Sequence, residues 1–336
     1  MSKKILITGI GGFIGSHFLS HVLVNTDWEV IGIDSWRHKG ISERLTDNEH
    51  YKKQFSRVRI FTHDLNAPIS EILIDKIGHI DYVVNFASES HVDRSITDPV
   101  PFVQNNVNIV LNMLELCKKI QPEKLIQIST DEVYGATDGI TNHPEWSAII
   151  PSNPYSASKA AQEAISVSYW RTYGTPLFLT NIMNTFGEMQ DKEKFIPMVI
   201  RKIKNGEEVI IHSDPEGKKS GARFWLHARN TSDAILYMLK NINLQKYPEF
   251  DRPHRFNIVG ERQISNLDIA QMISKIMNKE LKYRMVDAHS SRPGHDLFYG
   301  LDGKRLKDFG YDFPCNLEES LRKTINWTLE NERWVA

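Results

Sequence analysis

Residues 4–15 read KILITGIGGFIG, and this stretch decides the fold. A short β-branched apolar run, Lys4–Thr8, leads into glycines at the spacing Gly-x-x-Gly-x-x-Gly, and the apolar residues of Phe13–Val24 then recur at helical spacing. Glycines at this spacing let the backbone turn tightly and approach a pyrophosphate, which the N-terminus of the helix stabilises. The strand–turn–helix order is the context that the motif requires. The stretch therefore predicts a dinucleotide-binding turn, whose cofactor-binding residues are Gly9, Gly12, Phe13, Ile14 and Gly15.

An acidic residue stands where the ribose of a dinucleotide is expected. Asp34 follows the second predicted strand, Glu29–Ile33. A carboxylate at this place binds the ribose hydroxyls and repels a 2′-phosphate, which favours NAD over NADP. The basic residues Arg37, His38 and Lys39 follow closely and leave NADP as the alternative.

Strand and helix signals alternate through the first half of the chain. The further apolar strand runs are Val58–Thr62, Tyr82–Phe86 and Lys124–Ser129, and the longest segments with helical spacing are Val100–Lys118 and Pro154–Thr172. Such alternation predicts a parallel sheet with helices on both faces. The fold class is therefore α/β, with a doubly wound sheet of the Rossmann type.

The pattern loosens after about residue 175. The expected elements are the strands Leu177–Ile182, Val209–His212 and Arg255–Val259 and the helices Phe195–Asn205, Thr231–Lys240, Asn266–Met277 and Leu317–Glu330. Thr231 or Ser232 is the expected cap of its helix. We predict a cofactor-binding domain over residues 1–175, with a returning segment near 224–260. A smaller, mixed and discontinuous substrate-binding domain is expected over 176–336.

Composition excludes several classes of protein. The chain has 336 residues, is 40% hydrophobic and 25% charged, and carries a formal net charge of −1. These values exclude a disordered chain and a strongly basic nucleic-acid-binding protein. The two cysteines, Cys117 and Cys315, form no disulfide framework and favour a reducing compartment. With no signal-peptide pattern and no apolar run of about 18 residues, we expect a soluble cytoplasmic protein with no membrane or nucleic-acid partner.

A metal site has little support. His17 and His21 stand four residues apart on the first predicted helix, a spacing that can hold zinc. Phe18-Leu19-Ser20 stand between them in place of the glutamate of a metalloprotease motif, and no third ligand is evident. No metal is therefore expected.

A tyrosine and a lysine stand four residues apart in the segment Tyr155-Ser-Ala-Ser-Lys159. On a helix they share a face. An ammonium near a phenol favours the phenolate, so we expect Tyr155 to act as a base far below its free pKa of about 10. Such a base is what a hydride-transfer enzyme requires.

Two adjacent acids follow the strand Lys124–Ser129. Thr130-Asp131-Glu132 lies at the carboxyl end of this strand, the edge at which open α/β sheets bind ligands. Thr130 offers a hydroxyl to a substrate oxygen. In a cleft, two carboxyl groups can be tuned apart, so that one stays protonated as an acid and the other ionised as a base.

The motifs together resemble one enzyme family. The chain is similar to the extended short-chain dehydrogenases/reductases and, among them, to the nucleotide-sugar 4,6-dehydratases, typified by dTDP-glucose 4,6-dehydratase. The Thr-Asp-Glu triplet is the discriminating motif, because relatives that only epimerise or decarboxylate usually lack this acid pair. The matching stretches are Thr8–Gly15, Ser88–Ser95, Ser129–Gly135, Pro151–Ala160, Arg292–Asp296 and Arg322–Thr324.

The resemblance implies an internal redox reaction on a nucleoside-diphosphate sugar. Tyr155, assisted by Lys159 and Thr130, would take the proton of the 4-hydroxyl while carbon 4 is transiently oxidised by NAD. Glu132 would remove the proton on carbon 5 as base, and Asp131 would protonate the departing 6-hydroxyl as acid. Hydride return to carbon 6 would give a 4-keto-6-deoxy sugar without net redox.

The resemblance also assigns binding residues and an assembly. Arginines suit a diphosphate because the guanidinium makes paired, charge-assisted hydrogen bonds. The family pairs two long helices per subunit into a four-helix bundle, which here implies a homodimer through Val100–Lys118 and Pro154–Thr172, although their apolar residues are equally suited to face the sheet. The implied cofactor-binding residues beyond the glycine turn are Asp34, Asp64, Leu65, Phe86, Ala87, Ser88, Tyr155 and Lys159. The implied substrate-binding residues are Ser90, Arg94, Asn184, Lys194, His212, Arg223, Arg292 and His295.

Departures from the family pattern cluster in the substrate half. They include Thr185-Phe186-Gly187-Glu188 in place of Asn-Tyr-Gly-Pro, His212 in place of a tyrosine, and the longer loop Ser213–Ala222. These positions would touch the nucleobase pocket, so dTDP-, UDP- and CDP-linked glucose or N-acetylhexosamine all stay open. The alternatives to a 4,6-dehydratase are an epimerase or a 5,6-dehydratase of the same fold, or a catalytically silent NAD-binding protein.

Overall fold

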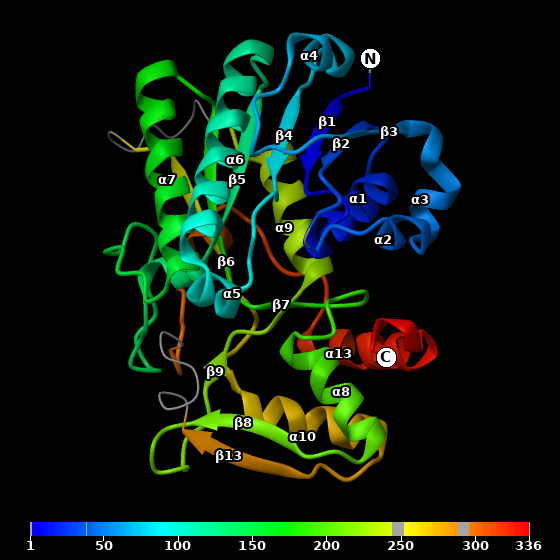
Figure 1. Ribbon diagram of the computed structural model, residues 1–336, viewed down its shortest axis with the longest axis vertical. Helices are drawn as coiled ribbons and strands as arrows, with labels where there is room; N and C mark the ends of the chain where they lie inside the picture. The colour runs from blue at the N-terminus through cyan, green and yellow to red at the C-terminus, as the bar shows by residue number, and fades with distance from the viewer. Residues whose placement is uncertain (1, 38, 244–251, 288–295, 336) are drawn as a thin grey trace.

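A seven-stranded parallel sheet forms the larger part of the molecule (Figure 1). The computed structural model describes residues 2–37, 39–243, 252–287 and 296–335. The strand order is β11-β6-β5-β4-β1-β2-β3, and every neighbouring pair is parallel. The strands are β1 (Lys4–Thr8), β2 (Glu29–Asp34), β3 (Val58–Thr62), β4 (Tyr82–Asn85), β5 (Lys124–Thr130), β6 (Leu177–Ile182) and β11 (His254–Ile258).

Alternate side chains of each strand enter the two layers of core that flank this sheet. In β1, Ile5 and Ile7 pack against helices α1 and α9 on one face, whereas Leu6 packs against α4 and α6 on the other. Both faces are therefore apolar, which is the pattern of a fully covered parallel sheet. The helices of this part are α1 (Phe13–Asn25), α2 (Glu43–Thr46), α3 (Glu49–Gln54), α4 (Glu71–Ile77), α5 (Val92–Thr97), α6 (Pro99–Ile120), α7 (Pro154–Tyr173), α9 (Ala228–Asn241) and α12 (Lys304–Asp308).

A smaller unit of helices and two-stranded sheets lies below the large sheet in Figure 1. Its core joins α8, α10, α13 and β8 through Ile200, Ile211, Ile273 and Leu321. The two parts are interleaved along the chain, because α9 and β11 return to the large sheet after α8 and β8 of the smaller unit. The elements of this unit and its links are α8 (Phe195–Asn205), α10 (Asn266–Met277), α13 (Leu317–Glu330), β7 (Thr185–Phe186), β8 (Val209–Ser213), β9 (Ala222–Arg223), β10 (Leu226–His227), β12 (Ile264–Ser265) and β13 (Tyr283–Asp287).

The predicted elements are confirmed, most to within one or two residues, with one clear error. Helix α9 begins at Ala228 rather than Thr231, and its cap is His227, whose Nδ1 accepts a hydrogen bond from the Arg229 N–H. The Ser232 hydroxyl instead donates to the carbonyl of Ala228, one turn earlier, at 2.8 Å. A hydroxyl that bonds back to the preceding turn is compatible with the helix interior, so a Thr-Ser pair marks no helix start here. Among the helices of the described residues, none combines the length and the apolarity needed to cross a membrane.

Candidate functional site

The glycine turn forms a close-packed cradle between β1 and α1. Gly9 has a φ of 63°, and its carbonyl accepts a hydrogen bond from the Gly12 N–H at 2.9 Å. A Cβ added to Gly15 would lie 2.2 Å from the Gly9 carbonyl oxygen, so a larger residue would displace the turn. No side chain caps the N-terminus of α1. The helix therefore presents its first N–H groups to an anion, which fits the pyrophosphate of a dinucleotide.

The Asp34 carboxylate lies at the end of β2, beside this turn. It is almost fully buried and accepts hydrogen bonds from the N–H groups of Gly11 and Trp36, at 2.8 and 2.9 Å. Two of the basic residues that made NADP an alternative cofactor have acidic partners. Arg37 pairs with Asp64 at 2.9 Å, and Lys39 pairs with Asp191 at 2.8 Å. His38 lies outside the described residues. The charge balance at this edge therefore favours a ribose hydroxyl over a 2′-phosphate.

Three further residues predicted to bind the cofactor follow β4, next to β1 at the point where the strand order reverses. Phe86 packs against the core of α1, and the Ala87 N–H donates to the Thr8 hydroxyl at 3.2 Å. The Ser88 hydroxyl donates to the Asn106 side chain on α6. A ligand crevice is expected at this switch point. Leu65, buried beneath α6, and Asp64 stand at the same edge.

The two predicted acids lie on a single turn of helix, η2 (Asp131–Tyr134), directly after β5. Thr130 caps this turn, and its hydroxyl donates to Asp131 Oδ1 at 3.0 Å. The second oxygen of Asp131 accepts no hydrogen bond from the part of the chain that the structure describes. Glu132 Oε2 accepts from the Asn153 amide at 3.3 Å. The pair is thus held at the carboxyl edge of the sheet.

Burial sets the proton affinity of both acids. It raises the pKa of Asp131 to about 7, with a contribution from the Glu132 charge and against the opposing charge of Arg223. Burial also raises the pKa of Glu132, while Asn153, Arg223 and Lys194 act in the other direction. A carboxyl group that keeps its proton near neutral pH is suited to act as a general acid.

Tyr155 and Lys159 lie on the first turns of α7, which an Asn153–Ser156 capping box begins. Lys159 is buried, and its ammonium donates to the Ile128 carbonyl and to Gln162 Oε1, both at 2.7 Å. Burial lowers the pKa of Lys159 to about 8, against the charge of Glu163.

The expected depression of the tyrosine pKa is wrong for the protein alone. Burial raises the pKa of Tyr155, and Glu132 and Asp131 raise it further, while a hydrogen bond to Thr130 lowers it. The physical reason is that a buried phenolate would face two carboxyl groups, whereas the Lys159 ammonium is directed to a carbonyl and an amide.

The predicted substrate-binding residues lie at different distances from the acid pair, and two of them lie outside the described residues. Arg223 and Lys194 lie close enough to the acids for their charges to lower the pKa of Glu132. Ser90 and Arg94 lie on the loop and helix α5 after β4, where Arg94 pairs with Glu89 at 3.5 Å. Among the others, Asn184 lies two residues after β6, and its buried Oδ1 has no hydrogen-bond partner within the described residues. His212 lies half-buried in β8, whereas Arg292 and His295 lie outside the described residues.

Arg223 is held by the protein rather than left free. Its guanidinium donates to the carbonyls of Ala222 and Asp296, at 2.7 and 2.8 Å, and to that of Leu297. It also lies 4.5 Å from the centre of the Tyr299 ring. Tyr299 is a residue that the sequence analysis missed. Burial raises its pKa, and the charges of Glu132, Asp296 and Asp131 raise it further. Its place three residues after the end of the matched stretch Arg292–Asp296 was the available signal.

The histidines considered as metal ligands belong to a different arrangement. His17 Nε2 lies 2.8 Å from the Glu188 carbonyl oxygen, and the Glu188 carboxylate lies 3.1 Å from His227 Nε2. His21 instead pairs with Asp233. Within the described residues, no group of three or more His, Cys, Asp or Glu residues is placed to hold a metal ion. The cluster joins α1 to the loop after β7 and to the start of α9.

This cluster predicts acid lability. Burial lowers the pKa of His17 to about 4, so the unfolded chain binds a proton there first as the pH falls below 6.5. Because the folded state resists this protonation, the free energy of unfolding decreases as the pH falls from about 6.5 towards 4. The expected decrease between pH 7 and pH 5 is about 2 kcal/mol. In His17→Phe, urea unfolding at the two pH values is expected to show a correspondingly smaller loss. The same change at the exposed His50 is the control, and an equal effect of the two substitutions would contradict the assignment.

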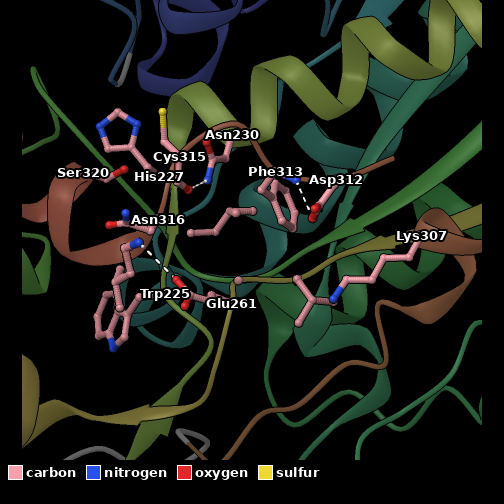
Figure 2. Close-up of a pocket in the computed structure, with 14 residues that line it drawn as sticks. Trp225, His227, Asn230, Glu261, Lys307, Asp312, Phe313, Cys315, Asn316 and Ser320 are labelled. Atoms are coloured by element: carbon pink, nitrogen blue, oxygen red, sulfur yellow. Dashed lines mark hydrogen bonds between the residues drawn. The ribbon is translucent and has the colours of Figure 1, made fainter. Parts of the chain in front are cut away.

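A pocket of about 210 Å³ lies apart from the predicted site. Figure 2 shows side chains of β10, α9 and the loop before α13 around it, including His227, Asn230 and Cys315. Asn230 donates to the Cys315 carbonyl at 2.8 Å, and Glu261 accepts from the Leu317 N–H. None of the residues predicted for catalysis or binding lines this pocket.

The family model described as GDP-mannose 4,6 dehydratase matches residues 6–324 of this chain. A dTDP-glucose 4,6-dehydratase of Salmonella typhimurium is 34% identical, over 99% of this chain and 94% of the relative. A trifunctional UDP-glucose 4,6-dehydratase/UDP-4-keto-6-deoxy-D-glucose 3,5-epimerase/UDP-4-keto-L-rhamnose-reductase of Arabidopsis thaliana is 32% identical, over 99% of this chain and 48% of the relative.

Among solved structures, a dTDP-glucose 4,6-dehydratase of Streptomyces venezuelae, crystallised with NAD bound, superimposes with a TM-score of 0.85. It is 29% identical, and the match covers 98% of each chain. The similarity thus extends over both the large sheet and the smaller unit.

Proposed function

This chain belongs to the GDP-mannose 4,6-dehydratase family, and we propose that it dehydrates a nucleoside-diphosphate glucose to its 4-keto-6-deoxy product. It is an NAD-dependent enzyme of the hydro-lyase class. The observation that carries the proposal is the acid pair of the buried Asp131 and the half-buried Glu132, which lie on η2 beside the Tyr155 phenol. An epimerase has no leaving hydroxyl to protonate, so a buried, protonatable Asp131 argues against that alternative.

The residues of this chain act in sequence on three carbons of the sugar, carbons 4, 5 and 6. Tyr155 Oη takes the proton of the 4-hydroxyl, and the Thr130 hydroxyl orients the same oxygen. Once carbon 4 is a ketone, the hydrogen on carbon 5 becomes acidic, and the Glu132 carboxylate removes it. Asp131 then donates its proton to the departing 6-hydroxyl, so that water leaves between carbons 5 and 6.

The glycine turn, Asp34 and the Phe86–Ser88 segment are the residues that would hold NAD. When bound, NAD would supply a reversible two-electron acceptor, so the hydride taken from carbon 4 would be returned to carbon 6 and no cofactor would be consumed. Because Tyr155 has a raised pKa in the protein alone, we propose that it becomes a competent base only when a cation stands beside it.

The Asp34 carboxylate predicts the choice of cofactor. In Asp34→Asn the charge that repels a 2′-phosphate is lost, and Arg37 then lies nearby without that opposing charge. We expect the affinity for NADP relative to NAD to rise by about tenfold. Calorimetric titration of the purified protein with each dinucleotide measures the ratio. Asp75→Asn, at an exposed position on α4, is the control, and an unchanged ratio in Asp34→Asn would contradict the role.

A panel of nucleotide sugars identifies which nucleotide the substrate carries. Purified protein is incubated with dTDP-, UDP- and CDP-glucose and with UDP-N-acetylglucosamine, without added reductant, and product mass is followed. Loss of one water from a single substrate is expected. Unchanged mass with an inverted sugar carbon would favour the epimerase alternative.

We further propose two domains, a homodimer and a cytoplasmic location. The large sheet would bind NAD and the smaller unit the nucleotide.

On α6, Val103, Val107 and Leu111 form a half-exposed stripe at i, i+4 and i+8, while Val110 and Leu114 are buried towards the sheet. The half-exposed stripe supports pairing with a second copy, which light scattering of the NAD-loaded protein measures. Neither Cys117 nor Cys315 is in a disulfide, which supports a reducing compartment.

A further inference from the structure

The ammonium of Lys159 is held by an uncharged side chain. It donates to the Ile128 carbonyl on β5 and to Gln162 Oε1 one turn later on α7, each at 2.7 Å. An ammonium has three donors, so two are used by the protein and one remains for a ligand. Gln162 is completely buried, and its amide is therefore committed to partners within the fold.

Gln162 is one end of a chain of buried polar side chains that crosses the sheet. Gln127 Nε2 on β5 lies 3.4 Å from Gln162 Oε1, and Asn85 Nδ2 on β4 donates to Gln127 Oε1 at 2.7 Å. The Thr8 hydroxyl on β1 donates to Asn85 Oδ1 at 2.5 Å. All four side chains are at most 1% exposed. The chain ends at the residue that immediately precedes the glycine turn.

A second branch reaches the segment after β4. Gln162 Nε2 donates to the Asn106 carbonyl on α6 at 2.6 Å. The Asn106 side chain in turn accepts from the Ser88 hydroxyl and from the Glu89 N–H, at 3.2 and 2.8 Å. The network thus joins Lys159 to two of the other segments assigned to the cofactor, the glycine turn and the segment that contains Ser88.

The direction of these hydrogen bonds is fixed by the ammonium. Because Lys159 can only donate, Gln162 must turn its oxygen towards it and its NH₂ towards the Asn106 carbonyl, which can only accept. Buried amides cost free energy unless their partners are in place. Reversing Gln162 would leave both contacts unmade, so a single arrangement is favoured.

The charged groups around Lys159 leave Gln162 as its nearest side-chain acceptor. On its own helix, Glu163 bonds to Arg255 of β11 at 2.5 Å, both fully buried. From η2, Asp131 and Glu132 act on the Tyr155 phenol rather than on Lys159. No carboxylate among the described residues bonds to the ammonium itself.

We propose that Gln162 is a positioning residue for Lys159, whose neutral oxygen places the ammonium against the cofactor site and ties it to Thr8 and Ser88 through one buried network. The inference rests on the proposed function, because Lys159 is assigned there as the partner of Tyr155. The neutral contact also accounts for the lowered pKa of Lys159, since burial is not offset by a directly bonded carboxylate.

The test replaces the neutral oxygen by a charged one of the same shape. In full-length protein labelled with ¹³Cε-lysine, the Lys159 signal is assigned by its absence in Lys159→Arg and titrated with pH. We expect a midpoint near 8 in the unmodified protein and an upward shift of about one pH unit or more in Gln162→Glu, because an opposite charge then contacts the ammonium. An unchanged midpoint in Gln162→Glu would overturn the proposal.

Gln162→Met removes the acceptor while keeping the length of the side chain. We expect kcat to fall about tenfold to a hundredfold with the KM for the nucleotide sugar unchanged. The control is Asn257→Leu on β11, where another buried amide holds the carbonyls of His143 and Asp302. Equal losses of kcat in the two variants would reduce Gln162 to a structural role. The titration of Lys159 requires no turnover. If no nucleotide sugar of the panel were converted but the Lys159 midpoint still shifted in Gln162→Glu, the proposed reaction would be refuted and the role of Gln162 would stand.

Discussion

Asparagine in place of Asp131 is expected to lower kcat about a hundredfold to ten-thousandfold, because the acid that protonates the departing 6-hydroxyl is lost. Asparagine keeps the oxygen that accepts from the Thr130 hydroxyl, so the turn η2 should be preserved. Oxidation at carbon 4 needs no acid at this position. Reduced cofactor is therefore expected to accumulate on the variant after substrate is added, detected by its near-ultraviolet absorbance.

The pKa of Asp131 gives this prediction a pH signature. With a pKa of about 7, the acid form is lost as the pH rises, so kcat of the unmodified enzyme should fall above neutrality. When folding raises the pKa of a carboxyl group, the contribution of that group to the stability of the folded state is lost as the pH rises through the raised pKa. Asp131→Asn should therefore be at least as resistant to urea at pH 8 as the unmodified protein.

The control for this change is Asp233→Asn. Asp233 is a partly buried carboxylate that bonds to Tyr311 at 3.0 Å, away from the acid pair. It should keep kcat and show no accumulation of reduced cofactor. If Asp131→Asn instead turned over at the normal rate, the role of Asp131 as the acid would be refuted.

Phenylalanine in place of Tyr155 is expected to stop the reaction one step earlier. The base that takes the proton of the 4-hydroxyl is then absent, and we expect kcat to fall by about a hundredfold to ten-thousandfold. In contrast to Asp131→Asn, no reduced cofactor should appear, because carbon 4 is never oxidised. Stopped-flow absorbance after mixing with substrate separates the two variants.

Tyr311→Phe is the matched control for Tyr155→Phe. Tyr311 is also buried, and burial likewise raises its pKa, but its hydroxyl bonds to Asp233. This variant should oxidise substrate normally. Appearance of reduced cofactor in Tyr155→Phe at the rate of the unmodified enzyme would remove Tyr155 from the role of base.

The sequence was sufficient for the parts of the site that depend on local pattern. The glycine spacing, Asp34 at the end of β2 and the acids after β5 are local motifs whose positions follow from parallel strands ending at one edge. The helices α8, α10 and α13 also have the predicted bounds, since apolar spacing and clear end signals agree there.

What the sequence did not reveal depends on contacts between distant segments. Lys159 was expected to lower the pKa of Tyr155, but its partners Ile128 and Gln162 are known only once α7 packs on β5. Glutamine at position 162 carries no motif of its own, and its importance comes from Gln127 and Asn106 on other elements. Likewise, Arg223 is held by the carbonyls of residues 296 and 297, over 70 positions away.

We expect one bound cofactor to oxidise carbon 4 and reduce carbon 6 of the same sugar while water is lost. The most direct test uses the nucleotide glucose found by the panel, labelled with deuterium on carbon 4, in ordinary water. The account predicts a 4-keto product that has lost one water and carries the deuterium on carbon 6. A product that keeps its mass and returns the deuterium to carbon 4, or one that loses the label to solvent, would contradict it.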